Sequence, residues 1–283
     1  MEVVKTIKQT RTMVAEAKKA GKKVALVPTM GNLHDGHLAL IDEAKKHADF
    51  IVCSSFVNPT QFGPKEGFDK YPRTGLQDQQ KLTFKSVAIL FSPPEYEIYP
   101  FGRNQTTVEV PHITKTLCGA ARPGHFSGVS TVVSKLFNIV QPDIALFGEK
   151  DFQQLVVIKK MVRELFYPID ILSIPTVREA DGLALSSRNI FLNTADRTLA
   201  PQLYATLSSV KYKMLAGERE FTKLAEEAEK RLSDKGFTAD YFEIRDAETL
   251  ERPSEGCSHL VLLGAVTLGN TRLIDNISLI LKS

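Results

Sequence analysis

The sequence contains no tryptophan and only three cysteines among its 283 residues. Cys53, Cys118 and Cys257 form an odd, scattered set whose spacing matches no common metal site. The number and spacing of the cysteines argue against a disulfide-stabilised secreted domain and against a cysteine zinc centre. We therefore expect a protein of the reducing cytoplasm.

Long apolar runs and an excess of charge of one sign are also absent. No window approaches about 18 consecutive apolar residues, so we expect no membrane-spanning helix and no membrane partner. Residues 1–19 carry charges throughout, which argues against a secretory signal. The chain has 36 Lys and Arg against 33 Asp and Glu, and this net charge of +3 is too even to predict nucleic-acid binding.

The most informative stretch is 24–38, which reads VALVPTMGNLHDGHL. Its first four residues are a continuous apolar run, typical of a strand buried on both faces of a parallel sheet, and we expect Pro28 to end the pairing. Gly31 and Gly36 let the backbone approach a ligand, and helical spacing of apolar residues starts at Gly36. A strand, a glycine-bearing turn and a helix N-terminus favour an anion site, because N–H groups and the helix dipole point to one spot.

Two imidazoles, His34 and His37, lie in this turn. A spacing of three brings their side chains to one side of a helical first turn, where each ring can donate to a phosphate oxygen. A single histidine here would more often be structural, but two that flank Gly36 favour phosphate binding. The segment resembles the His-x-Gly-His signature of the nucleotidylyl-transferase superfamily, which includes class I aminoacyl-tRNA synthetases. That resemblance implies ATP binding and attack on the α-phosphorus.

Two further junctions follow apolar runs. Residues 50–56 lead to Asn58 and Gln61, and ligands in open α/β sheets bind beyond the carboxyl ends of strands, so these side chains suit a polar substrate. The alternative is a plain Asn-Pro turn. Residues 144–147 lead to Gly148-Glu149-Lys150-Asp151 and a helix. Lys150 would then project at the same phosphates, and the alternative is helix capping with Asp151 as the N-cap.

The remaining elements divide the chain into two parts. We expect a helix that includes Val4 and ends near Gly21, a strand at 169–174, and a loop at 119–128 that folds over a site. Beyond about residue 190, helices at 195–216 and 221–234 precede strands at 240–245, 258–266 and 272–280, which suggests a small α+β domain. Ser186, Ser187 and Arg188 can donate to a triphosphate, although such a tripeptide also occurs in plain loops.

Taken together, the motifs resemble the pantothenate synthetase family over nearly the whole chain, most strongly over 24–190. They are PTMGNLHDGH at 28–37, FVNPTQF at 56–62, YPRT at 71–74, RPGHF at 122–126, FGEKDFQQ at 147–154, VRE at 177–179 and SSRN at 186–189. The resemblance implies ATP-dependent, Mg²⁺-assisted condensation of (R)-pantoate with β-alanine through pantoyl adenylate, with release of pyrophosphate and AMP. It also implies a homodimer.

The resemblance implies roles for particular residues. His37, with His34 and Lys150, would be catalytic; Gln61 and Gln154 would hold pantoate, with Gln61 also beside the β-alanine path. Asn58 is a further candidate for substrate binding because of its place at a strand end. The ATP site would comprise Met30, Gly31, Asn32, Leu33, His34, Asp35, Gly36, His37, Gly148, Glu149, Lys150, Asp151, Val177, Leu185, Ser186, Ser187 and Arg188. No protein ligand to the metal is identified.

The predicted fold is a Rossmann-like doubly wound parallel sheet in an ATP- and pantoate-binding domain at 1–180, with a small α+β lid domain at 181–283. One departure from the family is Leu185, where many members have Met, and this swap keeps volume and a backbone contact to adenine. An adenylyltransferase of the same fold would need extra cations for an acceptor phosphate. A silent nucleotide-binding regulator should have lost His37 or Lys150. The near-even charge disfavours a tRNA-charging activity.

Overall fold

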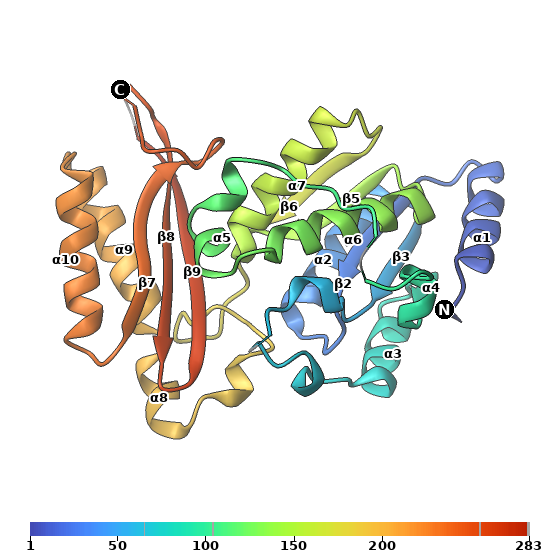
Figure 1. The fold of residues 1–283 in the computed structure, drawn as a ribbon, viewed down its shortest axis with the longest axis horizontal. Coiled ribbons are helices and arrows are strands. Elements are labelled where there is room, and N and C mark those ends of the chain that lie inside the picture. Colours follow the sequence, from blue (N-terminus) through green and yellow to red (C-terminus); the bar gives the residue numbers. More distant parts are fainter. Residues whose placement is uncertain (65, 104, 255, 282–283) are drawn as a thin grey trace. The chain divides into compact units, whose positions relative to one another are not determined.

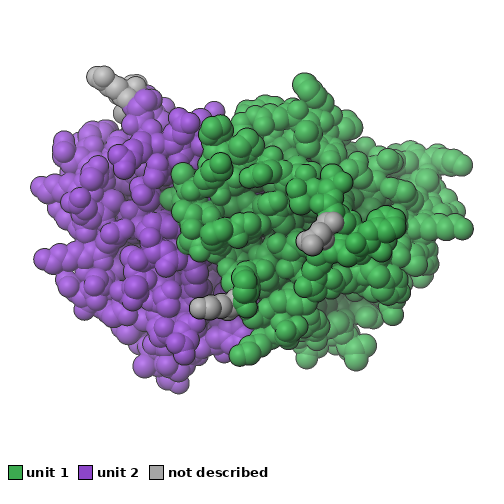
Figure 2. Space-filling view, viewed as in Figure 1, with its two compact units in different colours: residues 1–148, 157–175 green, residues 149–156, 176–283 purple. Residues whose placement is uncertain are grey.

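The computed structural model describes residues 1–64, 66–103, 105–254 and 256–281. The chain divides into two compact units, which Figure 2 distinguishes by colour. Unit 1 comprises Met1–Gly148 and Val157–Pro175, and unit 2 comprises Glu149–Val156 and Thr176–Ser283. The domain boundary that we place after residue 180 stays a prediction.

Unit 1 is built on a six-stranded sheet in the order β1-β4-β3-β2-β5-β6, with every pair parallel (Figure 1). The strands are β1 Glu2–Val4, β2 Val24–Thr29, β3 Phe50–Ser55, β4 Ile89–Phe91, β5 Ile144–Gly148 and β6 Asp170–Ile174. Continuous apolar runs form the central strands because both faces of a parallel sheet are covered by helices. The predicted α/β fold class is confirmed.

Helices connect these strands. They are α1 Ile7–Lys19, α2 Asp35–His47, α3 Gly75–Phe84, α4 Glu95–Ile98, α5 Cys118–Ala121, α6 His125–Val140 and α7 Phe152–Glu164. Right-handed crossovers put α2 and α3 on one face of the sheet and α1, α6 and α7 on the other. The packing of α1 against α6 agrees with this arrangement.

Strand β2 lies between β3 and β5, where the order of strands along the chain reverses. Ligands of open α/β sheets bind at such a switch point, beyond the carboxyl ends of the strands. Pro28 does not end the strand as predicted, because pairing with β3 continues to Thr29 while pairing with β5 stops at Leu26. A proline removes one N–H donor, so it can limit pairing on one side and leave the other intact.

Two other local predictions for unit 1 are wrong. Val4 belongs to the edge strand β1, paired with Phe91, and the helix starts only at Ile7, where Thr6 caps it. Residues 119–128 are not a single loop, because α5 ends at Ala121 and α6 already begins at His125. A three-residue strand and a one-turn helix are too short for periodicity to reveal.

Unit 2 has an antiparallel sheet in the order β7-β8-β9, with β7 Thr238–Asp246, β8 His259–Leu268 and β9 Thr271–Ile280. Its helices are α8 Thr194–Leu199, α9 Gln202–Leu215 and α10 Phe221–Ser233. The expected helix at 195–216 is interrupted at Pro201, which precedes α9. The core packs α9 and α10 on the sheet, and Gly264 admits Leu203, whose Cδ1 lies 2.8 Å from where a Cβ would stand. No helix among the described residues has the length and apolar character of a bilayer span.

Candidate active site

The turn after β2 contains two residues with positive φ. Gly31 has φ +79° and Asn32 has φ +52°, a region that glycine adopts freely and asparagine tolerates. Gly31 is also required for space, because a Cβ there would lie 2.8 Å from Ser55 Oγ and 3.1 Å from Asp78 Oδ2. The chain therefore turns sharply at the carboxyl end of β2 and enters α2.

Helix α3 holds this turn by its main chain. The buried Asp78 carboxylate accepts hydrogen bonds from the N–H groups of Asn32 and Leu33, each at 2.9 Å. Thr74 Oγ1 donates to Asp78 at 3.1 Å, and Lys81 Nζ donates to the Leu33 carbonyl at 2.5 Å. Hydrogen bonds to ionised groups are stronger than neutral ones, so the turn is fixed firmly from the helix.

The structure brings His34 and His37 together at the N-terminus of α2. His34 occupies the N-cap position, and the centroids of the two rings are 4.0 Å apart. The His34 N–H donates to His37 Nδ1 at 3.3 Å. Because Nδ1 accepts this bond, the neutral His37 ring carries its proton on Nε2 and can donate from there. An imidazole donor thus lies at the positive end of a helix dipole, which suits an anion.

Gln61 lies in the short turn after β3, where its Nε2 is 3.3 Å from Met30 Sδ. Asn58, 1% exposed, donates to Gln61 Oε1 at 3.0 Å and to the Gly128 carbonyl at 3.1 Å. Its Oδ1 accepts from the Tyr99 hydroxyl at 2.7 Å. Both the nitrogen and the oxygen of the Asn58 amide are therefore hydrogen-bonded to protein, and the bond to Gln61 Oε1 orients the Gln61 side chain.

Helix α6 approaches the same turn closely because residue 128 is glycine. A Cβ on Gly128 would lie 2.4 Å from the Thr60 carbonyl oxygen. At the start of α6, His125 Nδ1 is 2.8 Å from the Gln61 carbonyl oxygen, and Arg122 contacts His125 Nε2 at 3.0 Å. Since Arg122 can only donate, Nε2 accepts, and the Nδ1 proton is donated to Gln61.

Arg122 also forms a two-pronged ion pair with Glu66. Its Nε and Nη2 lie 2.5 Å and 2.6 Å from the two carboxylate oxygens. Burial by itself raises the pKa of Glu66, but the hydrogen bonds and charge of Arg122 outweigh it and lower the pKa to about 2. Glu66 is thus ionised at neutral pH and fixes Arg122 beside His125.

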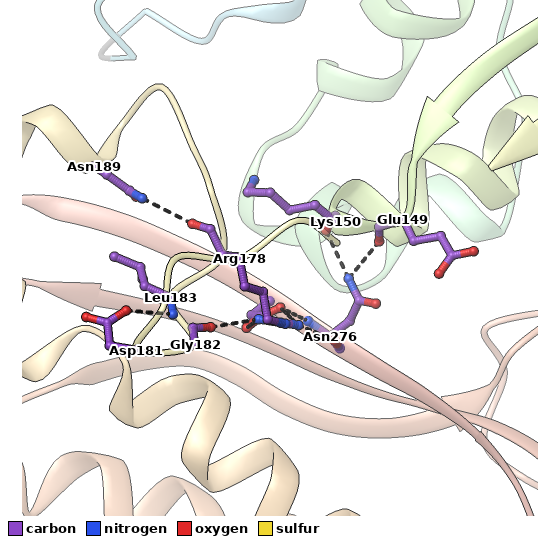
Figure 3. A network of polar contacts seen from close by, with 10 residues as sticks. Glu149, Lys150, Arg178, Asp181, Gly182, Leu183, Asn189 and Asn276 are labelled. Atoms are coloured by element: carbon purple, nitrogen blue, oxygen red, sulfur yellow. Dashed lines mark hydrogen bonds and ion pairs between the residues drawn. The ribbon is translucent and has the colours of Figure 1, made fainter. Parts of the chain in front are cut away.

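In unit 2, the turn Glu149–Asp151 carries Lys150 (Figure 3). The Lys150 side chain is 17% exposed, and its Nζ lies 3.7 Å from Asp151 Oδ2. Asn276 on β9 donates from Nδ2 to the Glu149 carbonyl at 2.8 Å and to the Lys150 carbonyl at 3.0 Å. Gln154 follows in the first turn of α7 and is half-buried.

Residues 177–185 form a narrow hairpin in unit 2. The Leu185 N–H donates to the Val177 carbonyl at 3.0 Å, and Arg178 pairs with Ala184. Gly182 near its tip has φ +94°, which favours glycine. The hairpin therefore brings Val177 and Leu185 together, although eight positions separate them in the sequence.

Arg178 anchors this hairpin to β9. Its guanidinium donates to both carboxylate oxygens of Asp275 at 2.6 Å and 2.9 Å, and it lies 3.6 Å from the centre of the Tyr204 ring. Asp275 is only 4% exposed, and this burial raises its pKa although Arg178 opposes the effect. A planar bidentate pair is the arrangement that best compensates a buried carboxylate.

The segment Ser186–Asn189 follows the hairpin as a tight turn. The Arg188 N–H donates to Ser186 Oγ at 3.2 Å, and the Asn189 N–H donates to the Ser186 carbonyl at 3.0 Å. Asn189 Nδ2 donates back to the Ala184 carbonyl at 3.1 Å. Two hydroxyls and a guanidinium are thereby gathered over three successive residues, Ser187 included.

The sequence-predicted site residues fall into two groups, one in each unit. Unit 1 holds Met30, Gly31, Asn32, Leu33, His34, Asp35, Gly36, His37, Asn58, Gln61 and Gly148. Unit 2 holds Glu149, Lys150, Asp151, Gln154, Val177, Leu185, Ser186, Ser187 and Arg188. Within unit 1 the turn after β2 meets Gln61 through Met30, and within unit 2 the hairpin and the Lys150 turn are both bonded to β9.

Several residues that shape these turns were missed by the sequence reasoning. One signal existed for Asp275, because Leu273, Ile277 and Leu279 lie at alternate positions and a charged residue interrupts that apolar face. Asp78 gave no signal, since an acidic residue in a helix is ordinarily solvated. Across the described part of the chain, no three or more His, Cys, Asp or Glu side chains are grouped so as to hold a metal ion.

Comparison with known proteins gives consistent matches. Residues 2–278 match the family model described as pantoate-beta-alanine ligase. A curated protein named pantothenate synthetase from Azotobacter vinelandii is 55% identical over 279 residues, covering 98% of this chain and 99% of the relative. One of the same name from Pseudomonas putida is 53% identical over 283 residues, covering 100% of this chain and 99% of the relative.

Solved structures give the same result. Pantothenate synthetase from Thermus thermophilus superposes with a TM-score of 0.92 at 42% identity, covering 98% of this chain and 99% of that chain. A pantoate-beta-alanine ligase from Francisella tularensis, described as complexed with beta-gamma ATP and beta-alanine, gives 0.83 at 36% identity, covering 98% and 97%.

Proposed function

Because the chain belongs to the pantoate-beta-alanine ligase family, we propose that its His34, His37 and Lys150 serve the ATP-dependent condensation of (R)-pantoate with β-alanine. The enzyme forms pantoyl adenylate and pyrophosphate first, and β-alanine then displaces AMP to give pantothenate. The family match over residues 2–278 carries the assignment of this activity. It favours a ligase over an adenylyltransferase or a silent nucleotide-binding regulator.

The first step needs positioning more than proton transfer. The pantoate carboxylate is already ionised at neutral pH, so it attacks the α-phosphorus without a general base. The barrier comes from repulsion between anions and from the charge that moves to the leaving pyrophosphate. Fixed donors lower this barrier because they need no rearrangement during the reaction. The His34–His37 pair at the N-terminus of α2 is the observation that best supports such a role.

Residues of unit 2 are also assigned to the phosphates of ATP. Lys150 supplies a full positive charge, and the turn at Ser186–Arg188 supplies two hydroxyls and a guanidinium. The hairpin that joins Val177 to Leu185 offers main-chain groups for the adenine ring. We assign all of these residues, with Met30 to His37, to ATP.

Pantoate is assigned to the two glutamines. A carboxamide both donates and accepts, so Gln61 and Gln154 suit the hydroxyls and carboxylate of a small polyol acid. Gln61 is oriented by the buried Asn58 and held at its main chain by His125. We therefore assign to Asn58 a positioning role that acts through Gln61, in place of direct substrate contact.

The second step requires an unprotonated amine on β-alanine, which attacks the acyl carbon while AMP leaves. His37 donates from Nε2 in the tautomer fixed by the His34 N–H, so its role is to stabilise phosphate charge. Pantoyl adenylate is labile to water, so exclusion of solvent is part of catalysis. The hairpin and the turn that follows it, residues 177–189, are our candidates for this cover.

We propose that the enzyme uses Mg²⁺, which would neutralise phosphate charge when bound together with ATP. The ion prefers carboxylate and phosphate oxygens and commonly uses one or two protein carboxylates. Glu149 and Asp151 flank Lys150 and are donors of this kind. They are our candidates to hold it.

Assembly and compartment are proposed on the family resemblance. We expect a homodimer, which sedimentation velocity would identify by mass. We also expect a cytoplasmic location, which suits a buried Cys53 thiol and a Cys257 thiol that donates to Asp246. Neither nucleic acid nor a membrane is proposed as a partner.

The deciding experiment measures pyrophosphate release from MgATP with (R)-pantoate, first without and then with β-alanine. We expect pantoate-dependent release of about one equivalent in the first phase, because the adenylate stays bound in a site that excludes water. Continuous turnover with AMP formation should follow once β-alanine is added. Absence of pantoate-dependent release from folded, ATP-binding protein would overturn the proposal.

A further inference from the structure

The main chain of the Lys150 turn is held by a side chain far along the sequence. Asn276 donates one amide hydrogen to the Glu149 carbonyl at 2.8 Å and the other to the Lys150 carbonyl at 3.0 Å. Figure 3 shows the carboxamide of Asn276 beneath these two oxygens. Both partners are carbonyls, so the nitrogen of the amide must face them. The two bonds fix the orientation of two successive peptide planes.

Fixing these planes matters because lysine is otherwise mobile. Its ammonium is carried on a four-carbon stem, and only the direction of the Cα–Cβ bond is set by the backbone. The two bonds from Asn276 fix that direction. They also engage two carbonyl dipoles whose negative ends would oppose a phosphate.

Asn276 is itself held rigidly. It is 6% exposed, pairs with Leu263 across the sheet, and donates its own N–H to Asp275 Oδ1 at 2.8 Å. The bidentate pair between Arg178 and Asp275 fixes the preceding residue. The carboxamide is therefore a preorganised donor whose position is determined by β9 and by the base of the 177–185 hairpin.

We propose that Asn276 is a positioning residue for adenylation, which aims Lys150 at the phosphates by holding the carbonyls of Glu149 and Lys150. The proposal rests on the proposed function, since it gives Asn276 a task only if Lys150 acts on ATP. A neutral donor suits this task, because a carboxylate at the same place would repel both carbonyl oxygens and offset the charge of Lys150.

The test compares Asn276→Ala and Asn276→Asp with the unchanged protein in pantoate-dependent pyrophosphate release. We expect kcat to fall about 10- to 100-fold in Asn276→Ala, the size of effect that a misplacement of about 1 Å produces, and further in Asn276→Asp. The KM for pantoate should change less than about twofold. Ser278→Ala is the matched control, since Ser278 is an exposed residue on the same face of β9, and it should retain full activity.

A double-substitution cycle separates positioning from general support of the fold. If Asn276 acts through Lys150, adding Asn276→Ala to Lys150→Ala should slow the residual reaction by less than about threefold. Equal losses in both backgrounds, or unchanged kcat in Asn276→Ala, would overturn the proposal. Thermal unfolding establishes which variants are folded, and Asn276→Ser, which retains one donor, replaces the alanine variant if that one is not.

The unchanged protein tells the two proposals apart. If it releases pyrophosphate with pantoate while Asn276→Ala does so equally well, only the role of Asn276 is refuted. If the unchanged protein, folded and bound to ATP, shows no pantoate-dependent release, the proposed function fails and the role of Asn276 fails with it.

Discussion

The turn after β2 and the turn after β5 carry the proposed phosphate-binding side chains, but they are held differently. In unit 1, Asp78 binds two N–H groups, 46 and 45 residues earlier in the chain, and Lys81 binds a carbonyl there. In unit 2, a neutral carboxamide binds two carbonyls, 127 and 126 residues earlier. The first turn is held by ionised groups of a nearby helix, and the second by the last strand.

The two turns therefore differ in the sequence distance between the turn and the residues that hold it. The turn before α2 is held from α3, which lies in the crossover from β3 to β4, so its geometry belongs to the parallel sheet and its helices. The Lys150 turn depends on β9, so substitutions near the C-terminus should reach the phosphate chemistry. Under the proposed mechanism, β9 would therefore support catalysis, since it holds the turn that carries Lys150.

The strongest test of the comparison removes the donor from each turn. We expect His37→Ala and Lys150→Ala each to lower the rate of pyrophosphate release by about 10²–10³, the usual effect of losing one preorganised donor. Both variants should fold, because His37 in the first turn of α2 and Lys150 in the turn Glu149–Asp151 are partly exposed and lie outside the buried core. Quenched-flow measurement of pyrophosphate with saturating ATP and pantoate gives the rates.

The control for Lys150 lies on α7, the helix that follows its turn, and the control for His37 lies on α2 itself. Lys159→Ala on α7 removes an exposed lysine, and His47→Ala removes the last histidine of α2, so each should leave the rate unchanged. Near-normal turnover in either site variant would show that the residue has no part in adenylation. The contacts that hold that turn would then be structural and would not support adenylation.

The second test weakens the support of the unit 1 turn. Asp78→Asn keeps the size of the side chain but replaces one acceptor oxygen with a donor, so a buried N–H is left without its partner. We expect a loss of about 1–3 kcal/mol in the free energy of unfolding, the range for an unsatisfied buried group. Adenylation should slow about tenfold, as the turn with His34 and His37 loosens. Urea unfolding and pyrophosphate release give the two values.

The matched control for Asp78→Asn is Gln77→Ala, an exposed neighbour on α3. It should change stability by less than about 0.5 kcal/mol. If Asp78→Asn were as stable and active as the unchanged protein, the turn would hold its shape by Gly31 and Asn32 alone, and the supporting role of α3 would be refuted.

The sequence predicted the main elements because their signals are local. Residues 50–56 and 144–147 are continuous apolar runs, and they form the central strands β3 and β5. Polar residues that follow these runs in the sequence, such as Asn58 and Lys150, were expected beyond the carboxyl ends of the strands because the runs mark where each strand stops. The short strand β1 was missed because three residues carry no measurable period, and Val4 matched a helical spacing by chance.

The supports of the site could not be predicted because they depend on pairing between distant segments. Asn276 is an ordinary polar residue of a strand until the structure places it against residues 149 and 150. The same holds for Asp275, whose pairing with Arg178 spans 97 positions. Local patterns identify which side chains can do chemistry, and tertiary contacts decide which side chains hold them in place.

The third test uses pH, because Arg122 and Glu66 extend the ionic support of unit 1 to Gln61. Arg122 lowers the pKa of Glu66 to about 2 against the opposing effect of burial, so the folded state favours the ionised form. A lowered pKa contributes stability above the unfolded value near 4.5, and that stability is lost as pH falls toward 2. We expect Glu66→Gln to be less stable by roughly 2–3 kcal/mol at pH 6, allowing for partial screening by solvent.

Thermal unfolding followed by circular dichroism should show this difference in stability between Glu66→Gln and the unchanged protein closing between pH 4.5 and 2. The exposed Glu43→Gln is the control and should show little difference at any pH. A gap that stays constant with pH would mean that packing, and not the ion pair, accounts for the contribution of Glu66.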